Sequence, residues 1–148
     1  LARTLEELRE RARGIHPAVL TDRGLGPALE ALAARAPIPV ELEAPTERLA
    51  PAVEAAAYYV VAESLTNMAK YGQATSAQVS LATENGTLQV TVSDDGVGGA
   101  DPERGSGLRG LADRVEALEG RFVVTSPPGC GTTITAEIPL HPARPTPG

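Results

Sequence analysis

Two adjacent carboxylates, Asp94 and Asp95, stand at the end of a segment in which apolar and polar residues alternate, residues 87–93. That period of two predicts a half-buried strand, and continuing it places Asp94 on the buried side and Asp95 on the solvent side. A buried carboxylate needs hydrogen-bond donors, and the amino group of a ligand such as adenine would supply one. Gly96 and Gly98 would let that ligand approach the backbone, although an ordinary Asx turn explains the same residues.

A second glycine-rich segment contains Gly105 and Gly107 and leads into a predicted helix that starts at Leu108. Free amide groups and the helix dipole make such a junction suitable for phosphate, although many strand-to-helix turns look alike. Arg104 and Arg109 flank the junction and are explained equally well as phosphate contacts or as exposed arginines. The helix is indicated by apolar residues at helical spacing: Leu108, Leu111, Ala112, Val115 and Leu118.

Three polar residues of another predicted helix, residues 51–71, are spaced by four and three: Glu63, Asn67 and Lys70. This spacing places an acid, an amide and an ammonium group on one stripe beside the core stripe. A solvated helix face is the alternative interpretation. Lys70 is the only lysine among thirteen basic residues, and a compact ammonium group meets phosphate well, so the stripe is a candidate wall of an anion site.

Four motifs in a fixed order carry a family resemblance. They are ESLTNMAKYG at residues 63–72, DxGxG at 94–98, GxGL at 105–108 and GxGT at 129–132. They resemble the nucleotide boxes of the ATPase superfamily that histidine kinases share with gyrase and the mismatch-repair ATPases, a family with the Bergerat-type fold. Four ordered motifs are far more specific than any one of them.

The resemblance implies ATP or ADP as the ligand and Mg²⁺ as the cofactor. It implies that Asn67 holds the magnesium ion, that Glu63 beside it orients water or metal, and that Asp94 reads adenine. An amide oxygen together with phosphate oxygens and water suits Mg²⁺. Thr132 falls on the buried parity of the last predicted strand, so its hydroxyl is a candidate partner for Asp94 and the adenine ring.

The first residues resemble one branch of this family. Residues 1–12 predict an amphipathic helix, which Gly14 and Pro17 interrupt. Residues 12–42 are similar to the junction between the dimerisation and catalytic domains in the nitrate-sensor and desaturase-regulator branch of histidine kinases. His16 is followed by proline instead of the acidic residue usual after a phosphoacceptor, so the acceptor is expected upstream of Leu1.

The order of predicted elements indicates an α/β fold. We expect a two-layer α/β sandwich, a mixed sheet with helices on one face, and Gly120 as the cap of the last helix. We expect residues 1–22 to form the end of a dimerisation helix and the junction, 23–141 the ATP-binding catalytic domain, and 142–148 a disordered tail. The expected elements are helix 27–36, strand 40–43, helix 51–71, strands 76–82 and 87–94, helix 108–119, and strands 121–125 and 132–140.

Composition narrows the function classes. The chain of 148 residues has a formal net charge of −6 and a pI near 4.9, which argues against a nucleic-acid partner. It contains no apolar run of membrane-spanning length and no signal peptide, so we expect a cytoplasmic domain, whether or not the full-length protein is anchored in the cell membrane. The single Cys130 is expected in a loop, and the start at Leu1 suggests a fragment.

The sequence therefore predicts the ATP-binding catalytic domain of a two-component sensor histidine kinase, which transfers the ATP γ-phosphate to a histidine upstream of this fragment. The implied partners are the dimerisation and histidine-phosphotransfer domain of the same protein and a NarL-type response regulator, with a homodimeric full-length protein. The alternatives are an anti-sigma-factor-type serine kinase and a nucleotide-sensing docking module without catalysis. The helix at residues 1–12 disfavours the first, and the complete motifs disfavour the second.

Overall fold

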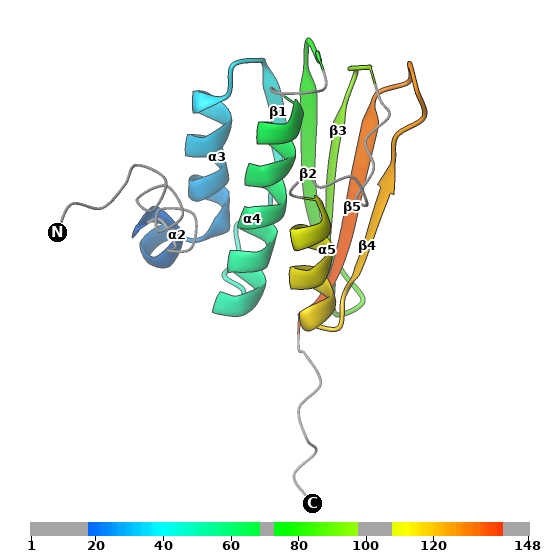
Figure 1. Cartoon of the computed structure of the whole chain (residues 1–148). Coiled ribbons are helices and arrows are strands. Elements are labelled where there is room, and N and C mark those ends of the chain that lie inside the picture. The colour runs from blue at the N-terminus through cyan, green and yellow to red at the C-terminus, as the bar shows by residue number, and fades with distance from the viewer. Residues whose placement is uncertain (1–17, 69–72, 98–107, 141–148) are drawn as a thin grey trace, which may run out of the picture.

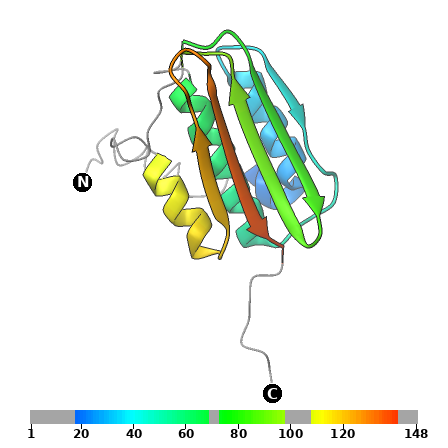
Figure 2. The same cartoon turned by 90° about the vertical axis from the view of Figure 1, so that its right-hand side faces the viewer.

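The computed structural model describes residues 18–68, 73–97 and 108–140. These residues form a five-stranded sheet with helices on one face, so the predicted two-layer α/β sandwich is confirmed (Figure 1; Figure 2). None of the helices in these ranges is long and apolar enough to cross a lipid bilayer. The elements in chain order are α2 Ala18–Arg23, α3 Leu25–Arg35, β1 Val40–Glu43, α4 Pro51–Asn67, β2 Ala77–Glu84, β3 Thr87–Asp94, α5 Leu108–Ala117, β4 Arg121–Thr125 and β5 Thr132–Pro139.

The sheet is mixed and has the strand order β1-β2-β3-β5-β4. β1 and β2 are parallel and are connected through α4, whereas the other neighbouring strands are antiparallel. The β2–β3 hairpin turns at Asn85 and Gly86, which both have positive φ, as a tight two-residue turn requires. Ala77, Asp94 and Thr132 form one rung across β2, β3 and β5, so the end of β3 meets the start of β5.

The core lies between the helices and one face of the sheet. Val90 and Val92 of β3 are fully buried, as the alternation of the strand predicts. α4 is the central helix and packs on β3 and β5. Its predicted core stripe is buried throughout: Val53, Ala57, Val60, Val61, Ser64, Leu65 and Met68.

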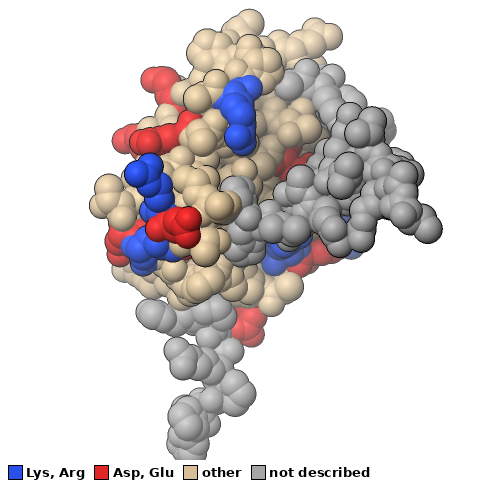
Figure 3. Space-filling model, turned by 90° about the vertical axis from the view of Figure 1, so that its left-hand side faces the viewer, with Lys and Arg blue, Asp and Glu red and all other residues tan. Residues whose placement is uncertain are grey.

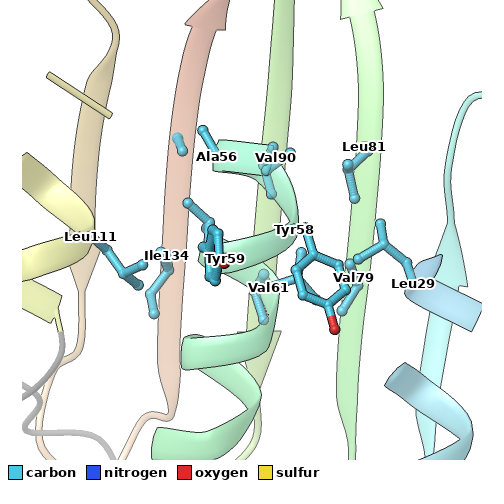
Figure 4. Close-up of a cluster of buried hydrophobic side chains, with 14 of the residues drawn as sticks. Leu29, Ala56, Tyr58, Tyr59, Val61, Val79, Leu81, Val90, Leu111 and Ile134 are labelled. Atoms are coloured by element: carbon cyan, nitrogen blue, oxygen red, sulfur yellow. The ribbon is translucent and has the colours of Figure 1, made fainter. Parts of the chain in front are cut away.

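α5 is held against α4 by an aromatic ring. Figure 4 shows Ile134 of β5 between Tyr59 of α4 and Leu111 of α5. The Arg114 guanidinium lies 4.4 Å from the centroid of the Tyr59 ring, and such a cation–π contact adds to the apolar packing. Burial raises the pKa of the Tyr59 phenol, and the Arg114 charge opposes that rise. These contacts fix the position of α5 beside α4.

The first helices differ from the prediction. A short helix, α2, precedes α3, and α3 begins at Leu25 instead of residue 27. Leu20 of α2 is buried in the core, although the sequence of this segment lacks a helical apolar stripe. Tertiary packing of Leu20 explains a helix that local pattern does not predict.

The cap of α5 also differs from the prediction. The left-handed residue after the helix is Glu119, with φ 65°, and Gly120 follows it, so the expectation that Gly120 caps the helix is corrected. Gly120 is needed for space, because a Cβ at that position would clash with the carbonyl oxygen of Glu137 in β5. β2 and β5 are Ala77–Glu84 and Thr132–Pro139, within two residues of the expected bounds.

A buried carboxylate ties α2 to α4. Glu54 in the first turn of α4 is 3% exposed, and its oxygens accept hydrogen bonds from Arg48 Nε at 3.2 Å and Nη2 at 3.3 Å and from the Leu49 amide at 3.1 Å. Arg48 Nη2 also donates to the Thr21 carbonyl oxygen of α2 at 3.1 Å. Gly24 leaves room for the Arg48 side chain, since a Cβ there would lie 2.8 Å from Arg48 Cδ. The Arg48–Glu54 pair therefore joins the start of the described chain to the central helix.

Candidate nucleotide site

Several predicted site residues gather at one edge of the sandwich, the upper edge in Figure 1. α4 ends there at Asn67, β3 ends at Asp94, and β5 begins at Thr132. Asp94 and Thr132 are direct neighbours in the sheet. α5 begins at Leu108 and lies beside α4, which places both helices on the same side of this edge.

Asp94 is both a partly buried carboxylate and the first residue of an Asx turn, the two possibilities that its sequence allowed. It is half-buried at the end of β3, and its Oδ1 accepts a hydrogen bond from the Gly96 amide at 2.7 Å, which is an Asx turn. No donor among the described residues reaches Oδ2. The carboxylate is therefore held in one orientation by its own turn, with one oxygen left for a ligand.

The glycines of the GxGT motif bring the start of β5 against Asp94. Gly131 has φ 75°, and a Cβ at this position would clash with the carbonyl oxygen of Asp94. Gly129 has φ 79°, and its amide donates to the carbonyl oxygen of Val97. Any side chain at position 131 would push the two strand ends apart. The motif thus closes the turn after β3 onto the loop before β5.

Thr132 lies beside Asp94, but its hydroxyl is already engaged. Thr132 Oγ1 and Ser126 Oγ are 2.6 Å apart, and either can be the donor. Ser126 Oγ also lies 3.4 Å from the Gly131 carbonyl oxygen, which it can reach as a donor. A role of Thr132 toward Asp94 and adenine remains a prediction, and Ser126 is a partner that the sequence did not reveal.

Asp95 is exposed, as the parity of β3 predicts, yet it also has a structural task. Its Oδ1 accepts hydrogen bonds from the Thr75 amide at 2.7 Å and the Ser76 amide at 3.1 Å, and its Oδ2 accepts one from the Thr75 hydroxyl. The Thr75 hydroxyl and these amides lower the pKa of Asp95 to about 2. The solvent-facing position that parity predicts for Asp95 therefore does not describe its whole role, because Asp95 fixes the segment that leads into β2.

The end of α4 forms a polar wall next to the rung of Asp94. Glu63 and Asn67 are half-buried and one helical turn apart. The Asn67 Nδ2 atom is buried and has no hydrogen-bond partner within the described ranges. Buried polar atoms normally have partners, so the Asn67 carboxamide has an unfilled hydrogen-bonding capacity of the kind that a ligand or water fills.

The structure describes some of the other predicted site residues, and the rest lie outside the described ranges. Leu108 is 2% exposed and belongs to the core, where it anchors the first turn of α5. Arg109 is exposed and forms an ion pair of 3.7 Å with Asp113. The predicted positions Lys70, Gly98, Gly105 and Gly107 lie outside the described residues, as do Arg104 and His16.

The comparison with protein families identifies the class of protein. Residues 52–142 match the model of the histidine kinase-, DNA gyrase B- and HSP90-like ATPase family. The chain belongs to this ATPase family, and it therefore has an ATP-binding domain.

Individual relatives narrow the similarity. The chain is 33% identical to the sensor histidine kinase MctS of Rhizobium johnstonii, over 95% of this chain and 33% of MctS. It is 36% identical to the sensor histidine kinase NarS of Mycobacterium tuberculosis, over 91% of this chain and 34% of NarS. The blue-light activated histidine kinase of Erythrobacter litoralis has a similar structure, with a TM-score of 0.68, 29% identity, and coverage of 78% of this chain and 42% of that one. The chain thus spans about a third of the length of these two curated relatives.

Sequence reasoning missed the residues that support the site. Gly131 was part of a recognised motif, but its close approach to the Asp94 carbonyl depends on strand pairing that no local pattern encodes. Asp95 and Thr75 are twenty positions apart, and Ser126 and Thr132 are six apart. Only the preference of Asp, Ser and Thr for hydrogen bonds to nearby backbone marks such residues in a sequence.

Proposed function

We propose that this chain is the ATP-binding catalytic domain of a two-component sensor histidine kinase, and that it transfers the ATP γ-phosphate to a histidine upstream of Leu1. The relatives are sensor histidine kinases, which supports this reaction. The observation that carries the proposal is the meeting of Asp94, Thr132 and Asn67 at one edge of the sandwich. It unites an acceptor for adenine and a ligand for metal in one place.

The free Oδ2 of Asp94 accepts a hydrogen bond from the adenine amino group, while the Asx turn keeps the carboxylate in place. The amide oxygen of Asn67 and the adjacent Glu63 carboxylate are oxygen ligands of the kind that Mg²⁺ prefers, together with retained water. The Nδ2 atom of Asn67, which has no partner within the described ranges, can donate a hydrogen bond to a phosphate oxygen. Bound Mg²⁺ would supply charge neutralisation at the phosphates. Lys70 meets a phosphate as a point charge in this proposal, and Gly105 and Gly107 approach the phosphates before α5. The protein's share of phosphoryl transfer is then mainly positioning and electrostatics.

The partners in this proposal are the dimerisation and phosphotransfer domain of the same protein, in a homodimer, and a NarL-type response regulator. Residues 1–22 form the junction to that domain, residues 23–141 the catalytic domain and 142–148 a tail, and the domain works in the cytoplasm. On the side of α2 and α3, basic and acidic side chains are interspersed in the described part of the surface (Figure 3). Such a mixed face suits reversible docking of a domain better than binding of a polyanion.

A phosphotransfer experiment tests the proposal. The chain is mixed with the dimerisation helices of the full-length protein, which carry the acceptor histidine, and with radiolabelled ATP. We expect label on the helices that is lost in acid and persists in base, as phosphohistidine requires. Base-labile, acid-stable label would instead indicate a serine kinase, and ATP binding without any transfer would indicate a docking module.

The chain alone is the control, since we expect it to bind ATP without labelling itself. Its two histidines, His16 and His141, lack an acceptor setting in the sequence. Label on the isolated chain that disappears in His16→Gln would overturn the assignment of the acceptor to another segment.

A further inference from the structure

Ser64 of α4 lies in the first family motif and in the buried stripe of the helix, but its hydroxyl has no role in the site described above. Its side chain is 0% exposed, and its Oγ has no hydrogen-bond partner within the described ranges. Thr66, two residues later, shows the usual solution for a helix hydroxyl, since its Oγ1 donates to the Ala62 carbonyl oxygen at 2.9 Å. A buried hydroxyl without a partner is unfavourable by about 1–3 kcal/mol, so Ser64 is a position where a ligand or a bound water is expected.

The geometry of the sandwich places Ser64 over the rung of Asp94. Ser64 follows Val61 by three residues and therefore shares its sheet-facing side of α4. In Figure 4, Val61 lies at the height of Val79 and Ile134 along the sheet. From there, three helical residues advance about 4.5 Å and two strand residues advance about 6.6 Å toward the same edge. The helical advance covers about two thirds of the strand advance, so Ser64 comes near the rung of Ala77, Asp94 and Thr132. α4 packs on the strands that carry Asp94 and Thr132.

The chemistry of adenine requires a donor at this place. Its 6-amino group donates, whereas the neighbouring ring nitrogen N1 accepts. The Asp94 carboxylate is an acceptor only and cannot satisfy N1. The Thr132 hydroxyl is within 2.6 Å of Ser126 Oγ and already shares a hydrogen bond there. Among the described residues, the Ser64 hydroxyl is a buried group on this part of α4 whose hydrogen bond is not used.

We propose that the Ser64 hydroxyl is a specificity-determining group of the nucleotide site, which donates a hydrogen bond to adenine N1, directly or through one water. The inference rests on the proposed function, since it assumes that adenine binds at Asp94. Asp94 and Ser64 together then read the donor and acceptor pair of adenine. Guanine presents a carbonyl oxygen and an N–H at the equivalent atoms and would meet both groups with the wrong polarity.

Titration of the chain with ADP and with 1-deaza-ADP, in which a C–H replaces N1, tests the proposal. Ser64→Ala should weaken ADP binding roughly fivefold to tenfold, the share of one hydrogen bond, and leave the affinity for 1-deaza-ADP unchanged. The melting temperature should not fall, because an unpartnered buried hydroxyl is removed. Thr66→Val is the matched control, since it removes a hydroxyl that is satisfied within the helix, and it should bind both nucleotides as the parent does.

Parent-like ADP binding by Ser64→Ala, or an equal loss for both nucleotides, would overturn the role of Ser64 at N1. If Ser64→Ala melts below the parent, Ser64→Cys, a weak donor of similar size, replaces it with the same two outcomes. Failure of the parent itself to bind ADP would contradict the proposed function instead, so the two failures are distinguishable.

Discussion

Replacing Asp94 by asparagine exchanges one carboxylate oxygen for an amide NH2 group and should nearly eliminate nucleotide binding. In the parent, Oδ1 accepts from the Gly96 amide at 2.7 Å, and no donor of the described residues occupies Oδ2, which can accept from the adenine amino group. An asparagine can place its oxygen toward Gly96 or toward adenine, but in either orientation its amide nitrogen opposes a donor. A hydrogen bond to a charged group contributes about 1.5–3 kcal/mol, so we expect ADP to bind about tenfold to a hundredfold more weakly or beyond detection.

Calorimetric titration with ADP measures this loss, and Asp95→Asn is the matched control. Asp95 is exposed and bonds to Thr75 and Ser76, so its replacement should change ADP affinity by less than about 1 kcal/mol. Both variants should retain the far-UV circular dichroism of the parent. Comparable losses of affinity in the two variants, or parent-like binding by Asp94→Asn, would refute the assignment of adenine recognition to Asp94.

Three further predictions concern the metal, the junction and acid stability. Asn67→Ala should remove most of the Mg²⁺ dependence of ATP affinity, and titrations with and without Mg²⁺ that differ as in the parent would exclude the metal role. Arg48→Ala should lower the free energy of unfolding by about 3 kcal/mol in urea titrations, because it leaves the Glu54 carboxylate, which is 3% exposed, without its charged partner. Glu54→Ala should have a smaller effect, because the half-exposed arginine that remains can be solvated by water. The pKa of Asp95 is lowered from 3.8 to about 2 in the folded chain, so ionised Asp95 stabilises the fold above pH 4, and this stabilisation is lost as the pH falls toward 2. When the free energy of unfolding is measured against pH, Asp95→Asn should depend less on pH between 4 and 2 than the parent does.

The sequence predicted well those features that repeat along the chain. Alternation in β3 located Val90, Val92 and the turn to Asp94, and helical spacing located the buried stripe of α4, because both patterns reflect one buried face. The short helix α2 was missed, since its place depends on the burial of Leu20 and on the bond from Arg48 to Thr21. Contacts between distant segments leave little local signal.

The same limit applies within the candidate site. Asp94 was found because strand parity singled it out, and the alternative of an Asx turn proved to be part of the same arrangement. The hydrogen bonds of Asp95 and the close approach of Gly131 depend on which strands are neighbours. The free hydroxyl of Ser64 became informative only when its burial was known, because serine in a helix is usually satisfied by its own backbone.

A crystal structure of the chain with ADP tests the central claim most directly. The account predicts adenine at the edge where β3 ends, with its 6-amino group within hydrogen-bond distance of Asp94 Oδ2 and the phosphates between the ends of α4 and the start of α5. Adenine bound elsewhere, such as on the face of the sheet that the helices leave uncovered, or bound at this edge without contact to Asp94, would contradict it.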